Sequence, residues 1–126
     1  MADPLIQKHL DQALHNEKLV SLQLGTQNQE FPDWTITMTF YFAVHRMQAA
    51  LLKDFNYYPD KHEDDRIERS RNRLVSAHYG AVSRLFMFFY HESRKARYQP
   101  NYYQKLDPKM IEKKVHDALT EFGKFP

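Results

Sequence analysis

FYFAVHRMQAALL, residues 40–52, decides the fold because it reads as the middle of a buried helix. Around it, from about Trp34 to Phe55, apolar side chains recur at steps of three and four residues on two sides. Such a helix packs on two sides, against the rest of the chain and, as one alternative, against a partner subunit. The two stripes are Phe40, Val44, Met47, Leu51, Phe55 and Trp34, Met38, Tyr41, His45, Ala49, Leu52, and the expected polar line is Thr35, Thr39, Arg46, Lys53.

The neighbouring residues His45 and Arg46 point in different directions on this helix. Arg46 falls on the polar line, where we expect it to be solvated. His45 falls within the second apolar stripe, where a buried and hydrogen-bonded histidine is favoured over a ligand or a catalytic group.

Start and stop signals divide the rest of the chain into helices. The pattern from 63 to 98 predicts two helices with a break between 72 and 80. We therefore expect one all-α domain over 1–126, an antiparallel four-helix bundle with an additional C-terminal helix. The predicted starts are Asp3 with Pro4, Asp33 as a cap, and Asp107 with Pro108, and the predicted stops are Gly25 and Gly123.

The composition excludes several classes of protein. The chain of 126 residues has 42% hydrophobic residues and no Cys, which excludes disordered chains, disulfide frameworks and thiolate metal sites. The first 18 residues carry charges throughout and do not form a signal peptide, and no apolar run has the length of a membrane span. We expect a cytoplasmic protein without a cofactor, since there is no Gly-rich phosphate loop and the consecutive residues 62–65 do not converge on one metal ion.

Arginines concentrate in one segment, although the net charge of the whole chain is only +2. Residues 66–97 hold eight Arg or Lys against two Glu, and seven of the eight are Arg, which binds phosphate or carboxylate through a planar fork. If the third and fourth helices turn these faces toward each other, they form a cationic groove edged by tyrosines. Alternatively, Arg97 and Tyr98 lock the helix end to acidic partners. The candidate ligand-binding residues are His45, His62, Arg66, Arg69, Arg73, Arg94, Arg97 and Tyr98.

The order of these motifs resembles the HEPN superfamily of small helical proteins. DWTITMTFYFAVHRMQAALL is followed by YYPDKHEDDR and then by ESRKARY, over residues 33–98. The resemblance implies a bundle that dimerises through its helical faces and binds nucleic acid or a nucleotide. It also implies that the protein comes from a defence system, a toxin–antitoxin pair or a mobile genetic element. The partners that it implies are RNA, DNA, an antitoxin-like protein or a nucleotidyltransferase-like protein. In such a homodimer we expect His45 near the subunit seam or the groove beside it.

Many members of the superfamily are metal-independent ribonucleases with an Arg followed, after four to six residues, by a His. Arg steadies the scissile phosphate and His acts as acid or base. The best set with this spacing is Arg71, Asn72 and His78, although about one such spacing arises by chance in this composition. In nuclease branches the motif lies at the last main helix, where this chain has SRKARY without a following His.

Three functions therefore stay open on the sequence. The leading hypothesis is a non-catalytic binding module for nucleic acid, a nucleotide or an acidic partner. The second is a ribonuclease toxin of a toxin–antitoxin pair, and the third is a non-catalytic dimeric scaffold.

Overall fold

The computed structural model describes residues 3–57 and 65–125, and every regular element in these ranges is helical. This confirms the all-α prediction and the expected number of helices, five α-helices, within the described residues. The elements are α1 (Pro4–Thr26), α2 (Pro32–Phe55), α3 (Asp65–His78), α4 (Gly80–Tyr98), the short 3₁₀ helix η1 (Tyr102–Lys105) and α5 (Pro108–Phe122).

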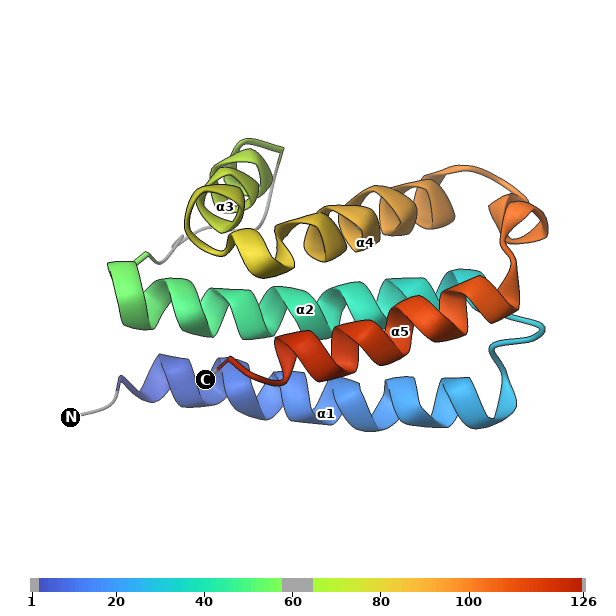
Figure 1. Ribbon diagram of the computed structural model, residues 1–126, viewed down its shortest axis with the longest axis horizontal. Helices are drawn as coiled ribbons and strands as arrows, with labels where there is room; N and C mark the ends of the chain where they lie inside the picture. Colours follow the sequence, from blue (N-terminus) through green and yellow to red (C-terminus); the bar gives the residue numbers. More distant parts are fainter. Residues whose placement is uncertain (1–2, 58–64, 126) are drawn as a thin grey trace.

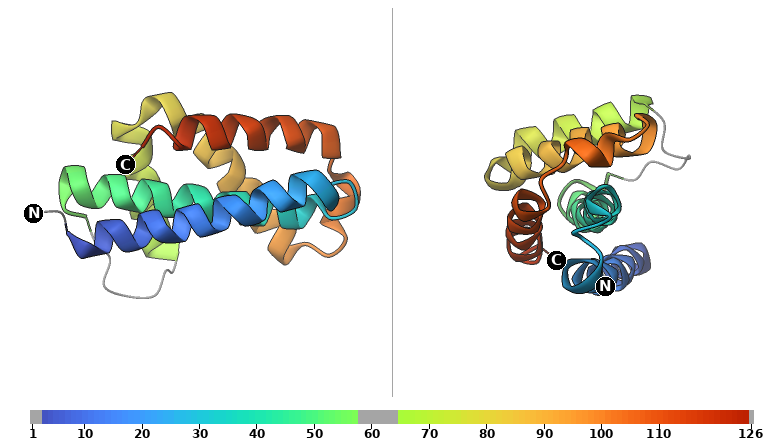
Figure 2. Two further views of the ribbon diagram at one scale, coloured as in Figure 1. Left: turned by 90° about the horizontal axis from the view of Figure 1, so that it is seen from below. Right: turned by 90° about the vertical axis from the view of Figure 1, so that its right-hand side faces the viewer.

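Helix α2 is the centre of the molecule (Figures 1 and 2). α1, α2, α4 and α5 run roughly along the long axis, each in the direction opposite to the one before it in this series, whereas α3 lies across them. α5 packs against both α2 and α4. The helix that departs from the common direction is therefore α3.

The two apolar sides of α2 are both covered within one chain. Phe40 packs against Phe86 of α4 with ring centroids 5.8 Å apart, and Phe86 in turn packs against Phe122 of α5 at 6.2 Å. On the other side α1 contributes the buried residues Ala13 and Val20. The two-sided pattern is thus satisfied by the chain's own helices, and it does not require a partner subunit.

The predicted polar line of α2 is wrong at its first two residues. Thr35 and Thr39 are fully buried, and their hydroxyls donate to the main-chain oxygens of Phe31 and Thr35, at 3.3 and 2.7 Å. A threonine can enter a core in this way because its hydroxyl finds an acceptor one turn earlier in its own helix. Trp34, predicted to lie in an apolar stripe, is instead 54% exposed.

Most helix ends follow the predicted signals. Asp3 accepts from the Leu5 main-chain N–H at 2.8 Å, and Asp107 accepts from that of Lys109 at 3.1 Å. The expected break in the Arg-rich segment falls at Tyr79. The prediction that Asp33 caps α2 is wrong, because α2 already begins at Pro32, whose fixed φ suits a first helical position.

Candidate functional site

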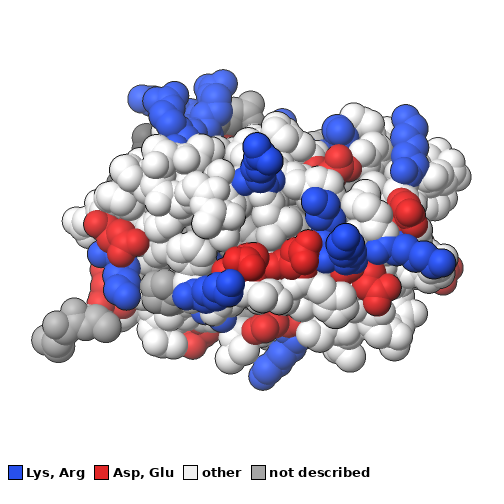
Figure 3. Space-filling model, viewed as in Figure 1, with Lys and Arg blue, Asp and Glu red and all other residues white. Residues whose placement is uncertain are grey.

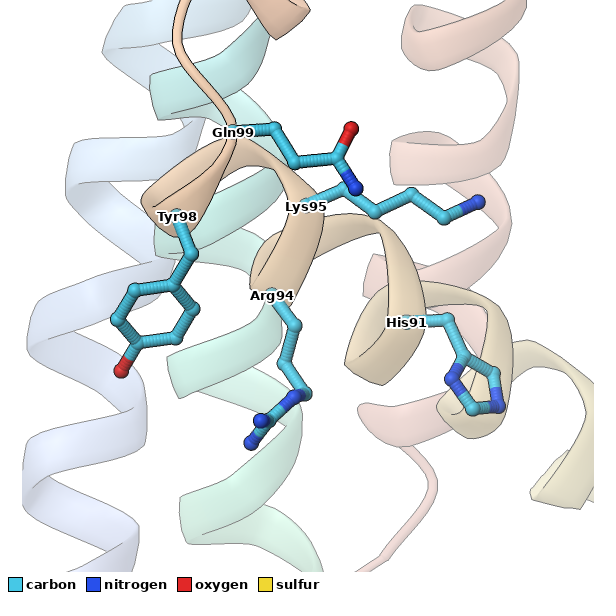
Figure 4. A pocket seen from close by; sticks show the side chains of 5 residues that line it. All are labelled: His91, Arg94, Lys95, Tyr98 and Gln99. Carbon is cyan, nitrogen blue, oxygen red and sulfur yellow. The ribbon is translucent and has the colours of Figure 1, made fainter.

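Basic and aromatic side chains meet on the last two turns of α4, at the surface. Five residues line an open pocket of about 300 Å³ there, and we call them the α4 end. In Figure 4 Arg94 and Tyr98 extend to one side of the helix, and His91 and Lys95 extend to the other. Tyr98 is 68% exposed, so its ring is open to a ligand. The α4 end consists of His91, Arg94, Lys95, Tyr98 and Gln99.

Arg94 is positioned by a residue of α3. Its Nη1 forms an ion pair with Glu68 at 3.0 Å, and its guanidinium lies 5.7 Å from the centre of the Tyr98 ring. Glu68 also accepts from the Tyr90 hydroxyl at 3.0 Å, and burial, together with this hydrogen bond, raises the pKa of Tyr90. The Arg94 side chain remains 38% exposed, so it is oriented without being covered.

Arg97 instead joins the end of α4 to α2. Its Nε donates to the main-chain oxygen of Ser93 at 3.2 Å, and its Nη1 donates to the Tyr41 hydroxyl at 3.2 Å. Its guanidinium also lies over the rings of Phe40, Tyr41 and Tyr98. Arg97 therefore holds the end of α4 against α2, and its partners are a tyrosine and a main-chain oxygen where acidic residues were predicted.

The arginines of α3 do not face the α4 end. Arg66, Arg69 and Arg73 are exposed on the outer side of α3, and Figure 3 shows basic side chains projecting over this helix. The side that α3 turns inward carries Glu68 and Arg71. The structure therefore has two separate basic surfaces where a single groove between facing helices was predicted.

Arg71 is a core residue. It is 1% exposed, and its guanidinium lies 5.6 and 5.5 Å from the ring centres of Phe40 and Phe86. Its Nε and Nη2 donate to Oδ1 of the buried Asn72 at 3.3 Å, and burial lowers the pKa of Arg71 to about 10. The sequence did carry a signal for this burial, since Arg71 stands three residues before Leu74.

The structure does not assemble Arg71, Asn72 and His78 at an open site. His78 is exposed, and its ring packs on Phe55 with centroids 4.2 Å apart. Arg71 lies seven residues earlier, about 10 Å along the same helix, and its side chain is buried on the inward side of α3. A phosphate that reaches His78 is therefore not in contact with the buried Arg71 guanidinium.

His45 lies at a seam between two helices of the same chain. Its Nδ1 is 2.9 Å from Nδ1 of His9 on α1, so the two rings share one hydrogen bond. Burial, followed by the neighbouring His9, lowers the pKa of His45 to about 4. His9 was missed by sequence reasoning, although it stands three residues after Ile6 and four before Ala13, on the inward side of α1.

The expectation that Arg46 is solvated is wrong. Arg46 is half-buried and donates from Nη1 to the main-chain oxygen of Phe125 at 3.0 Å.

Three other expectations stay predictions. His62 lies outside the described residues. The homodimer stays a prediction. The exposed large apolar side chains of α1 and α2 are Leu14, Leu19, Leu22, Trp34 and Phe55. Cytoplasmic location also stays a prediction.

The described part of the chain contains neither a membrane-spanning helix nor a cluster of metal-binding side chains. None of its helices is long and apolar enough to cross a membrane. Within residues 3–57 and 65–125, no three His, Asp or Glu side chains are grouped so that they can hold a metal ion.

Comparisons with protein-family models, with curated proteins and with solved structures found no match for this chain.

Proposed function

We propose that this chain is a non-catalytic binding module for nucleic acid and that the α4 end is its contact surface. The observation that carries the proposal is an exposed tyrosine beside an oriented arginine in an open pocket of about 300 Å³. Arg binds phosphate through its planar fork, and an exposed aromatic ring stacks with a base. The two groups together suit a single strand, whose bases are free to stack.

The ion pairs at the α4 end leave its cations available to a phosphate. Arg94 pairs with Glu68 at 3.0 Å and Lys95 with Glu92 at 3.5 Å, with both cationic side chains more than a third exposed. Glu68 and Glu92 are only 14% and 17% exposed, so a phosphate is expected to contact the exposed parts of Arg94 and Lys95 without displacing their carboxylates. Glu68 and Glu92 orient these two cations in the absence of a ligand.

The proposal agrees with the HEPN-like motifs of the sequence, since that superfamily is associated with nucleic acid and nucleotides. The ribonuclease alternative gains no support from the buried Arg71 and the distant His78. An acidic protein partner is the main competing ligand, because it presents carboxylates to the same cations.

The test is fluorescence anisotropy with a labelled single-stranded RNA over a range of salt concentrations. We expect wild-type affinity to fall steeply with salt, because each neutralised phosphate releases counterions. Combining Arg94→Ala with Tyr98→Ala lowers affinity about tenfold or more, through the lost phosphate contact and the lost stacking.

Arg84→Ala is the matched control, since Arg84 is an exposed arginine of α4 outside the α4 end. We expect it to retain nearly the wild-type affinity. An affinity that does not change with salt, or a double variant that binds like Arg84→Ala, would overturn the proposal.

A further inference from the structure

A second, smaller cavity lies on the other side of the last turn of α4, against the first turn of α2. Its volume is about 160 Å³, below the range of about 300–1,000 Å³ typical of sites that enclose a whole small molecule. It therefore admits one planar group and not a complete ligand. Its lining residues are Asp33, Trp34, Thr37, Ala96 and Arg97.

Asp33 supplies hydrogen-bond acceptors to this cavity. Its Oδ1 is buried and has no hydrogen-bond partner among the described residues. The nearby Thr37 hydroxyl is already committed, since it donates to the main-chain oxygen of Asp33 at 2.9 Å. A buried carboxylate oxygen without a donor is costly, so this position favours a ligand that carries N–H groups.

Arg97 supplies donors to the same cavity. Its Nε and Nη1 are held by Ser93 and Tyr41, which fixes the plane of the guanidinium. Its Nη2 donates to none of the residues that the structure describes. Within those residues Arg97 and Asp33 also form no ion pair with each other, although both line the cavity. The Asp33 carboxylate can therefore accept hydrogen bonds from one edge of a ligand, and the Arg97 guanidinium can donate hydrogen bonds to another edge.

Trp34 supplies an aromatic surface at the rim. It is 54% exposed at the start of α2, where an exposed indole has no role in the core. A large aromatic face beside donors and acceptors is the arrangement with which proteins hold an unpaired base.

We propose that this cavity binds a guanine base, as part of the nucleic acid that the α4 end holds; the inference rests on that proposed function. Guanine presents N–H groups on its Watson–Crick edge, which suit Asp33, and the O6 and N7 acceptors, which suit an arginine. Adenine presents an unprotonated N1 to the carboxylate and is disfavoured. Arg97 adjoins Arg94 through their shared contact with Tyr98, so a strand that contacts the α4 end passes close to the cavity.

The single tryptophan of the chain makes the inference directly testable, because Trp34 lines the cavity itself. The intrinsic fluorescence is titrated with GMP, AMP, CMP and UMP, which carry the same phosphate, and with ribose 5-phosphate. We expect GMP to quench the fluorescence at concentrations about tenfold lower than AMP, and ribose 5-phosphate to have no effect. Asp33→Asn loses the preference for GMP, whereas Asp11→Asn, an exposed carboxylate of α1, keeps it.

The outcomes separate this inference from the proposed function. Equal quenching by GMP and AMP, or no quenching by either while labelled RNA still binds with salt dependence, overturns the guanine site alone. Quenching by GMP without any binding of RNA overturns the nucleic-acid module and leaves a nucleotide site. A GMP preference that survives Asp33→Asn removes the assigned role of the carboxylate.

Discussion

An arginine on the inner side of α3 and an arginine of the α4 end both contact aromatic rings, but they lie in opposite environments. Arg71 lies between the rings of Phe40 and Phe86 and is 1% exposed, whereas the Arg94 side chain is 38% exposed beside Tyr98. Both arginines belong to one Arg-rich segment, and both contact aromatic rings. What separates them is the side of the helix on which each stands, so the density of arginine in a sequence does not locate a binding surface.

The largest effect that sharpens this contrast is on stability. Arg71→Ala removes a buried side chain from a closely packed site, so we expect it to lower the free energy of unfolding by about 2–4 kcal/mol. Arg73→Ala, two residues later on the exposed side of the same helix, changes it by about 0.5 kcal/mol or less. Urea denaturation followed by circular dichroism measures both, and equal losses would show that Arg71 is not a core residue.

The comparison of these two arginines also shows which features of the fold can be predicted from the sequence. Helical spacing and capping signals predicted the five helices, because helix formation and helix ends depend on neighbouring residues. Arg71 stands three residues before Leu74, on the inward side of the helix, but the sequence analysis considered it as a catalytic residue and not as part of the core. The crossing of α3 and the meeting of His9 with His45 depend on how helices pack, which no local pattern encodes.

The candidate site was predicted only in part for the same reason. Arg94 and Tyr98 were identified from residue type, and the structure brings them together at the α4 end. Asp33 and Trp34 were interpreted as a cap and a core residue. Their joint cavity with Arg97 arises because the start of α2 lies against the end of α4, a tertiary contact between residues about 60 positions apart in the chain.

The contact between His9 of α1 and His45 of α2 shows the effect of burial on two histidines. The pKa values of His9 and His45 are both lowered in the fold, so the unfolded chain binds more protons below the ordinary value of 6.5. Stability is therefore complete near neutral pH and falls as the pH drops from about 6.5 toward about 4. After allowance for partial solvent exposure, we expect a loss on the order of 1–2 kcal/mol.

Denaturation in urea at about pH 7 and about pH 5 measures this loss. His45→Phe should flatten the dependence, because it removes the group with the larger shift. His116→Asn is the control, since His116 is an exposed histidine on α5, away from the contact between His9 and His45. An unchanged pH dependence in His45→Phe would place its origin elsewhere in the molecule.

The outer arginines of α3 provide a smaller effect. Replacing Arg66, Arg69 and Arg73 together by Gln leaves the fold intact, because all three are exposed. We expect RNA affinity to fall only about two- to fivefold, through weaker long-range attraction that disappears at high salt. Anisotropy at low and high salt measures this, and a loss larger than that of the Arg94→Ala, Tyr98→Ala variant would move the binding surface to α3.

The smallest expected effect concerns cleavage. Metal-independent hydrolysis of RNA needs a general acid or base beside a cation that contacts the same phosphate. His78 stacks on Phe55 at the surface, whereas Arg71 is enclosed about 10 Å away along the helix, so the two cannot share a phosphate in this fold. We therefore expect no cleavage of labelled RNA by the wild-type protein in EDTA, and none by His78→Ala. Cleavage by the wild type that disappears in His78→Ala would show that α3 rearranges to expose Arg71, and the contrast between covered and open arginines would then fail.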